Sequence, residues 1–276
     1  YALDFCLMYL LPTVHYFFRR VGGYRDGIDS FSFDAKELFR LLRVSWPVLV
    51  SGGFAQINLK IDVVLIAFLG SVSQVGIYSA ASRLSEAWSI VAMALVTAIF
   101  PGLVRASRED SKAYSRMLSM MFGSLIWISL AGAITISLTS AFIVDLIYGP
   151  SFAEAAAVLS IHVFGGVFLI IRTALSRWLI VEGLLIFSLV SHVSGAAINV
   201  IANFILVPRF GVTGAAWATV LSYSVSALLF LLLSSRTRPM FAIIVLSAFP
   251  FGFAKRWTAV FVPRLESQKS VDEAHP

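Results

Sequence analysis

Ionisable and amide side chains lie inside two long apolar runs of the sequence, residues 46–69 and 76–104. The first run contains Gln56, Asn58, Lys60 and Asp62, and the second contains Arg83 and Glu86. Such residues bind anions, exchange protons or hold cations, and inside an apolar run they need partners or a wet cavity. We therefore predict a polar site, with Lys60, Arg83, Gln56 and Asn58 as ligand-binding residues.

The spacing of the charged residues predicts which of them meet. With the turn near residues 72–73, Asp62 and Arg83 lie at the same depth, about 15 Å from the turn at 1.5 Å per residue. We expect them to form an ion pair. Lys60 and Glu86 also match in depth, but Lys60 is about 200° around the helix from Asp62, so both pairs cannot face one neighbour.

Helical spacing also divides the first run into two polar faces. Gln56 and Lys60 share one face, and Asn58 and Asp62 share the opposite one. We expect Asp62 to be structural and Lys60 to be exposed to a lumen, with Asp62 and Glu86 serving as a structural or ion-coupling pair. A buried network of all four charges, locking two helices, remains the alternative.

Small and amide residues recur at every fourth position in two later runs, residues 179–207 and 212–235. They are Ser191, Gly195, Asn199 and Asn203, followed by Gly214, Ala218, Ser222 and Ser226. Such stripes are typical of helix contacts in membranes, and a turn at Pro208-Arg209 places Asn199 level with Ala218. We expect the stripes to pack together. Substrate binding by Asn199 and Asn203, lining a sugar passage, is the alternative because amides donate and accept hydrogen bonds.

Catalytic chemistry has little support in the sequence. His162 and His192 lie in apolar runs, but no acidic residue stands at a helical spacing from either, so buried, hydrogen-bonded histidines are expected. The sequence has no phosphate-binding loop, dinucleotide-binding turn or metal-ligand cluster. We therefore expect a protein that is not an enzyme and that uses no cofactor or metal.

The chain is so apolar that polar residues within its apolar runs are unexpected. Of 276 residues, 59% are hydrophobic and 13% are charged, against about a quarter charged in soluble domains; the mean hydropathy is +0.88. The single cysteine, Cys6, excludes a disulfide framework within the chain. The formal charge is +6, but the basic residues lie between apolar runs, so nucleic acid is not expected as a partner.

Seven apolar runs have about the length of 20 residues that a membrane-crossing helix requires. They are residues 2–18, 46–69, 76–104, 117–144, 155–175, 179–207 and 212–235. Lipid excludes unpaired backbone, and these runs lack the alternation of a membrane barrel. The predicted fold class is all-α, a polytopic membrane helix bundle of about seven transmembrane helices.

The basic residues give the bundle an orientation. Eighteen of the 21 lysine and arginine residues fall on one side of these spans, which is then cytoplasmic; Arg209 lies opposite, and Lys60 and Arg83 lie within spans. Arg172 and Arg177 are expected at a cytoplasmic helix end, as topology-setting charges or, alternatively, as ligands for anionic headgroups.

Several segments resemble a known family when they are taken in order. They are Leu42-Arg43-Val44-Ser45-Trp46-Pro47, Lys60-Ile61-Asp62, Val75-Gly76-Ile77-Tyr78-Ser79-Ala80-Ala81-Ser82-Arg83-Leu84-Ser85-Glu86, Ala98-Ile99-Phe100-Pro101, Tyr148-Gly149-Pro150-Ser151-Phe152, and residues 203–216, beginning Asn203-Phe204. Residues 41–234 resemble the C-terminal half of a bacterial Wzx-type polysaccharide flippase of the multidrug/oligosaccharidyl-lipid/polysaccharide exporter superfamily.

The resemblance implies a domain plan. Residues 1–18 would be the truncated last helix of an N-terminal bundle, and residues 19–43 a cytoplasmic linker with an amphipathic helix. Residues 44–235 would form the C-terminal six-helix bundle, followed by a cytoplasmic or interfacial tail, residues 236–276. Because the sequence begins at Tyr1 within an apolar run, we expect an N-terminal bundle to be missing.

The resemblance also implies a function. Two facing bundles would move undecaprenyl-diphosphate-linked oligosaccharide across the bacterial inner (plasma) membrane for O-antigen or exopolysaccharide biosynthesis, by alternating access coupled to H⁺ or Na⁺. The expected partners are this lipid-linked oligosaccharide and membrane lipids. The alternatives are a drug or lipid-precursor exporter of the same superfamily, for which acidic cavity residues are expected, and a membrane-embedded polymerase, ligase or acyltransferase of the same pathway.

Overall fold

A computed structural model of the chain describes residues 35–109 and 111–249. Its elements are α2 (Ala35–Leu69), α3 (Val72–Glu109), α4 (Ser111–Leu138), α5 (Ser140–Tyr148), η1 (Pro150–Phe152), α6 (Glu154–Val181), α7 (Leu185–Ala227), η2 (Leu229–Leu233) and α8 (Arg238–Ser247). Every regular element in these ranges is helical, which confirms the all-α fold class. The predicted run 2–18, the linker up to residue 34 and the tail beyond residue 249 lie outside the described residues.

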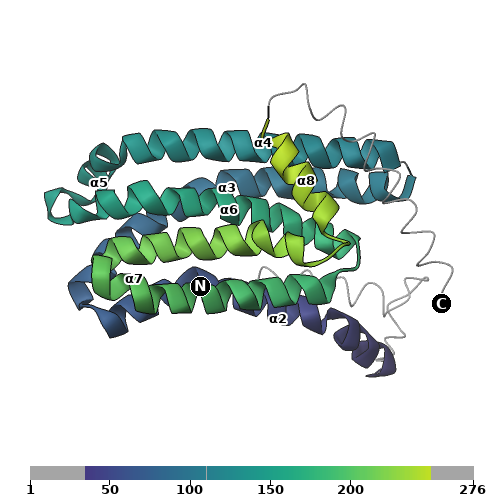
Figure 1. The fold of residues 1–276 in the computed structure, drawn as a ribbon, viewed down its shortest axis with the longest axis horizontal. Coiled ribbons are helices and arrows are strands. Elements are labelled where there is room, and N and C mark those ends of the chain that lie inside the picture. The colour runs from purple at the N-terminus through teal and green to yellow at the C-terminus, as the bar shows by residue number, and fades with distance from the viewer. Residues whose placement is uncertain (1–34, 110, 250–276) are drawn as a thin grey trace, which may run out of the picture. The chain divides into compact units, whose positions relative to one another are not determined.

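Five helices are long and apolar enough to cross a membrane: Ser45–Leu69, Val72–Arg108, Ser111–Leu138, Glu154–Val181 and Leu185–Leu233. The last of them contains two of the predicted runs, because α7 has a non-helical residue at Gly211, with φ 59°. The chain reverses its direction there, and α7 forms a helical hairpin (Figure 1). A side chain on Gly214 would collide with the Leu206 carbonyl, so this tight reversal requires glycine.

Several predicted boundaries differ from the structure. The expected linker helix and the span after it form one continuous helix, α2, which runs through Pro47; membrane helices tolerate proline where neighbouring groups satisfy the freed carbonyl. The predicted run 117–144 is divided at Thr139 into α4 and α5. The turn after α6 lies at residues 182–184, where Gly183 has φ 70°, and not between residues 175 and 179.

The chain separates into two units, residues 1–49 and 50–276, and the packing described below belongs to the second. Helix α6 lies between α4 and α7 in Figure 1 and packs against α3, α4 and α7. Two clusters of buried hydrophobic side chains hold these helices together. One includes Phe122, Ile170 and Leu179, and the other includes Ile66, Tyr78 and Leu159.

The short helix α8 crosses the longer helices obliquely (Figure 1). Met240, Ile243 and Ile244 are buried on one side of it. A methyl group on Gly123 of α4 would lie 3.2 Å from the backbone oxygen of Ser247. A glycine in α4 therefore allows the end of α8 to approach closely.

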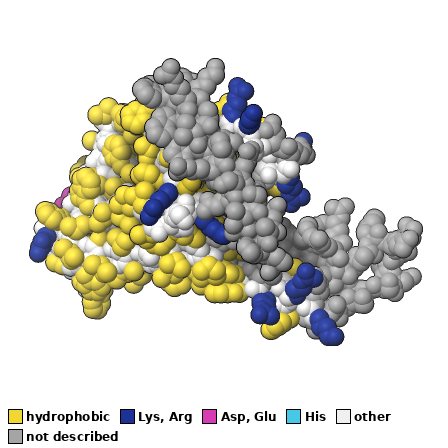
Figure 2. All heavy atoms as spheres, turned by 45° about the vertical axis from the view of Figure 1, so that its right-hand side comes forward, with side chains coloured by type: hydrophobic (Ala, Val, Ile, Leu, Met, Phe, Trp, Pro, Cys, Tyr) yellow, Lys and Arg dark blue, Asp and Glu magenta, His cyan; other side chains and the backbone are white. Residues whose placement is uncertain are grey.

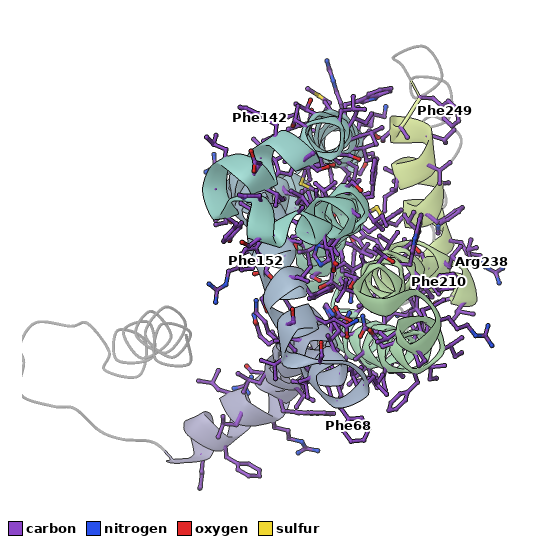
Figure 3. All side chains as sticks on the ribbon, turned by 90° about the vertical axis from the view of Figure 1, so that its left-hand side faces the viewer. Phe68, Phe142, Phe152, Phe210, Arg238 and Phe249 are labelled. Carbon is purple, nitrogen blue, oxygen red and sulfur yellow. The ribbon has the colours of Figure 1, made fainter. Side chains whose placement is uncertain are left out.

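The outer surface has the composition of a surface that contacts lipid. Hydrophobic side chains cover most of the described face in Figure 2. Phe68, Phe142 and Phe249, labelled in Figure 3, are between 58% and 78% exposed. Large exposed apolar side chains are unfavourable in water but not against acyl chains, so the predicted membrane helix bundle is confirmed.

Candidate functional site

Asp62 lies at the centre of a buried polar cluster that we call the Asp62 cluster: Asp62, Tyr78, Asn199, Asn203 and Thr219. The Asp62 carboxylate is only 2% exposed and accepts three hydrogen bonds. Asn203 Nδ2 donates to Oδ1 over 2.7 Å, Thr219 Oγ1 donates to Oδ2 over 2.8 Å, and Tyr78 Oη donates to Oδ2 over 3.0 Å. The donors come from α3 and from both halves of the α7 hairpin.

The predicted ion pair between Asp62 and Arg83 is wrong. Arg83 is exposed, and its side chain forms no ion pair with Asp62 in the described part of the chain. Tyr78, five residues earlier and therefore about 140° away around α3, faces Asp62 instead. Two side chains must lie at equal depth to make contact, but the direction of each α3 side chain around the helix axis determines which one faces Asp62. That direction depends on how α3 packs against α6.

Lys60 and Glu86 do form an ion pair. Lys60 Nζ lies 2.9 Å from each Glu86 carboxylate oxygen, and the two side chains are 57% and 27% exposed. Lys60 is therefore exposed, and its exposure to a lumen stays a prediction. The alternative of one buried network of four charges is not what forms, because Asp62 is bound by neutral donors and Arg83 is exposed.

The two predicted faces of α2 are also confirmed. Gln56 and Lys60 are exposed, whereas Asn58 and Asp62 are buried. Asn58 is 4% exposed, its Oδ1 has no hydrogen-bond partner among the described residues, and its Nδ2 lies 3.5 Å from the position of a methyl group on Gly195. One face of α2 therefore packs against the α7 hairpin, and the other presents polar groups outward.

We call four polar residues within α2 and α3 the polar strip: Gln56, Lys60 and Arg83, which are exposed, and Glu86, which is part-exposed. Lys60 is nine residues before the end of α2 at Leu69, which places it about 14 Å along the helix from that end. Charged groups at this depth are costly against acyl chains. The strip therefore requires a water-filled cavity or another protein surface.

The two small-residue stripes of α7 pack together, as expected, but one turn further along than predicted. Asn199 Nδ2 donates to Ser222 Oγ over 3.4 Å, and a methyl group on Gly195 would lie 2.9 Å from Ser226 Cβ. The register differs because the chain reverses at Gly211, beyond Pro208-Arg209. Asn199 and Asn203 are both 0% exposed, so they lie inside a helix contact in this conformation.

The expected position of Arg172 at a helix end is wrong. It lies well inside α6, which continues to Val181, and it is 3% exposed. Its Nη2 donates to Ser191 Oγ over 2.6 Å and to the Ser188 carbonyl over 3.2 Å, while Nε and Nη1 have no partner in the part of the chain that the structure describes. Arg177, in the last turns of α6, lies 5.5 Å from the Phe100 ring centroid.

The histidines are not arranged for catalysis. His162 is buried, and its ring meets the Tyr78 ring edge-on at 5.6 Å. His192 Nε2 lies 3.5 Å from Ser176 Oγ, but that hydroxyl donates to the Arg172 carbonyl over 2.9 Å. A serine bound to its own helix backbone is not activated as a nucleophile.

Sequence reasoning missed Tyr78 and Thr219 as members of the Asp62 cluster. Tyr78 lies in a segment that was noted only for its resemblance, and Thr219 directly follows Ala218 of the second stripe. The sequence feature that could have identified Thr219 is its position one residue from a predicted contact stripe. For Tyr78, the only available signal was a hydroxyl-bearing aromatic residue within an apolar run.

Comparison with known proteins shows what this chain is similar to. The family described as polysaccharide biosynthesis protein matches residues 7–107. Two proteins of Haloferax volcanii are similar to the chain. The probable flippase AglR is 27% identical over 179 residues, covering 61% of this chain and 36% of AglR. The probable low-salt glycan biosynthesis flippase Agl15 is 25% identical over 197 residues, covering 71% and 41%.

Two solved structures share the fold. A MOP superfamily transporter from Pyrococcus furiosus aligns with a TM-score of 0.57 and 20% identity, over 69% of this chain and 43% of the transporter. The lipid II flippase MurJ, in an inward closed conformation, aligns with a TM-score of 0.60 and 17% identity, over 89% and 57%. The chain spans less than half the length of the curated relatives it matches. The chain is thus similar in sequence to two probable flippases, and similar in fold to a MOP superfamily transporter and a lipid II flippase.

Proposed function

We propose that this chain is the C-terminal bundle of a flippase for undecaprenyl-diphosphate-linked oligosaccharide in the bacterial inner membrane. The transported unit would supply a cell-surface polysaccharide such as O-antigen or exopolysaccharide. The observation that most supports this proposal is the exposure of Lys60 and Arg83 at mid-span depth, on a chain whose relatives are named as probable flippases.

The polar strip has the chemistry of a site for an anionic headgroup. A diphosphate that leaves water must replace its hydration with charged or hydrogen-bonding groups. Lys60 supplies a point charge, and Arg83 supplies a planar fork that binds phosphate oxygens in pairs. Gln56, one turn from Lys60 on the same face of α2, offers an amide to sugar hydroxyls. The lipid tail would remain against apolar helix surface.

The Asp62 cluster is the proposed coupling site for H⁺ or Na⁺. It combines a buried carboxylate with the hydroxyls of Tyr78 and Thr219, and the buried Oδ1 atoms of Asn58 and Asn203 have no hydrogen-bond partner within residues 35–109 and 111–249. Such oxygens suit a hard cation or a proton. Because the cluster joins α2, α3 and α7, a bound cation would change the packing of all three and shift their conformational equilibrium.

The charges of the polar strip argue against the exporter alternative. A site for a lipophilic cation needs an excess of acidic groups, whereas this strip has two cations, Lys60 and Arg83, and one carboxylate, Glu86. The acyltransferase alternative needs an activated nucleophile. Ser176, the hydroxyl beside His192, is bound to its own helix.

Glycan export in cells tests this proposal. In the intact protein, Lys60→Ala and Arg83→Ala should each lower surface glycan by about tenfold, the effect of about 1.4 kcal/mol, while membrane levels stay unchanged. Arg108→Ala is the matched control because Arg108 is an exposed arginine in the last turn of the same helix as Arg83. Export that survives both strip variants would contradict the proposal.

A further inference from the structure

Glu86 is the one anionic member of the polar strip, and it is bound to a cation before any ligand arrives. Both its carboxylate oxygens lie 2.9 Å from Lys60 Nζ. Arg83, one turn earlier on α3, is exposed and forms no ion pair with another residue of the described ranges. A headgroup that takes Lys60 therefore competes with Glu86 for that cation, whereas one that takes Arg83 competes only with water.

The two members of the pair differ in how firmly they are placed. The Lys60 side chain is 57% exposed and that of Glu86 only 27%, and lysine has a long, flexible stem. Lys60 is therefore able to swing between ligands while Glu86 stays in place. When Lys60 leaves, Glu86 remains as an unpaired carboxylate at mid-span depth, which is unfavourable.

We propose that Glu86 is the release residue of the headgroup site: its carboxylate competes with the diphosphate for Lys60 and recovers Lys60 when the headgroup leaves. This inference rests on the proposed function. A site made only of Lys60, Arg83 and Gln56 would bind a diphosphate tightly, and tight binding of the substrate slows departure without speeding passage. An internal anion lowers the affinity and thereby shortens the residence time of the ligand.

The competition predicts a divergence between affinity and transport. Removing the carboxylate in Glu86→Gln frees Lys60, so the affinity for a diphosphate should rise by about tenfold, which is the effect of about 1.4 kcal/mol. Transport should nevertheless fall, because release becomes slower. A purely structural role for the pair predicts that affinity, transport and thermal stability fall together.

The experiment uses the intact purified protein that contains this chain. Farnesyl diphosphate and inorganic pyrophosphate serve as soluble probes, with binding measured by calorimetry and thermal unfolding measured in parallel. Transport of a fluorescently labelled farnesyl diphosphate is followed in vesicles made with the same preparations. Glu154→Gln is the matched control because Glu154 is an exposed carboxylate at the start of α6, outside the strip.

We expect Glu86→Gln to bind both probes more tightly and to transport the labelled lipid more slowly, with Glu154→Gln like the parent. Unchanged or weaker binding in Glu86→Gln would overturn the release role, as would tightening confined to the prenyl probe, which would assign the effect to the tail. Lys60→Ala separates this outcome from failure of the proposed function. If Lys60→Ala leaves diphosphate binding intact, the headgroup site itself is wrong; if it weakens binding, only the release role is at issue.

Discussion

Replacing Asp62 with alanine tests the Asp62 cluster as the junction of three helices. The change removes the acceptor of three hydrogen bonds, from Asn203, Thr219 and Tyr78. Hydrogen bonds inside membrane proteins contribute about 0.6 kcal/mol on average and up to about 1.7, so the three together stabilise the fold by about 2 to 5 kcal/mol.

Two effects reduce this loss. The donors keep other partners: Asn203 Nδ2 lies 2.9 Å from the Asn199 carbonyl, and Tyr78 Oη lies 3.1 Å from Thr219 Oγ1. The variant also removes a buried carboxylate, whose desolvation is unfavourable. We therefore expect Asp62→Ala to lower the free energy of unfolding by about 2 kcal/mol, near the lower end of the hydrogen-bond sum.

Reversible unfolding of the intact protein in mixed micelles, followed by circular dichroism, measures this change. Asp62→Asn keeps one acceptor oxygen and should lose about half as much, roughly 1 kcal/mol. Asp145→Ala, the control, removes an exposed carboxylate on α5 and should stay within about 0.5 kcal/mol. If Asp62→Ala unfolds like the control, the cluster does not hold the helices together.

Substitutions at three further positions test the packing of the bundle, each measured by thermal unfolding. Gly132→Ala should destabilise the protein by about 1 to 3 kcal/mol, because a methyl group there would collide with the Trp88 ring; an unchanged melting temperature would contradict this α3–α4 contact. Gly195→Val should separate the α7 hairpin, since even a methyl group would lie 2.9 Å from Ser226 Cβ; tolerance of valine would refute the observed register. Arg172→Met should stay within about 1 kcal/mol of the parent, because two of the three guanidinium nitrogens of that buried side chain have no partner among the described residues. Arg172→Ala should be clearly less stable because it leaves a cavity. Equal losses of stability in both variants would show that the charge itself is needed.

The membrane spans could be predicted because lipid imposes a length and a composition on each helix. The depth comparison also placed Lys60 level with Glu86, but the ion pair that it favoured was Asp62 with Arg83, whereas the structure pairs Lys60 with Glu86. Helical spacing separated the two faces of α2, because that separation depends only on the period of one helix.

The errors share a physical cause. The partner of Asp62 depends on the rotation of α3 about its axis, and the packing of α3 against α6 sets that rotation. The predicted run ends at residue 175, with Arg172 and Arg177 at that helix end, whereas the turn occurs at Gly183, with φ 70°. Tertiary packing decides the rotation of α3 and the end of α6, and the sequence of a single apolar run does not reveal that packing.

Transport in vesicles tests the central claim most directly. The intact protein would be reconstituted, and the movement of a fluorescent disaccharide linked to a polyprenyl diphosphate would be compared with that of a lipophilic fluorescent cation. We expect the protein to move the lipid-linked sugar and not to carry the cation. Lys60→Ala combined with Arg83→Ala should abolish the movement of the lipid-linked sugar. Transport of the cation without the sugar lipid, or of the sugar lipid without either basic residue, would contradict the central claim.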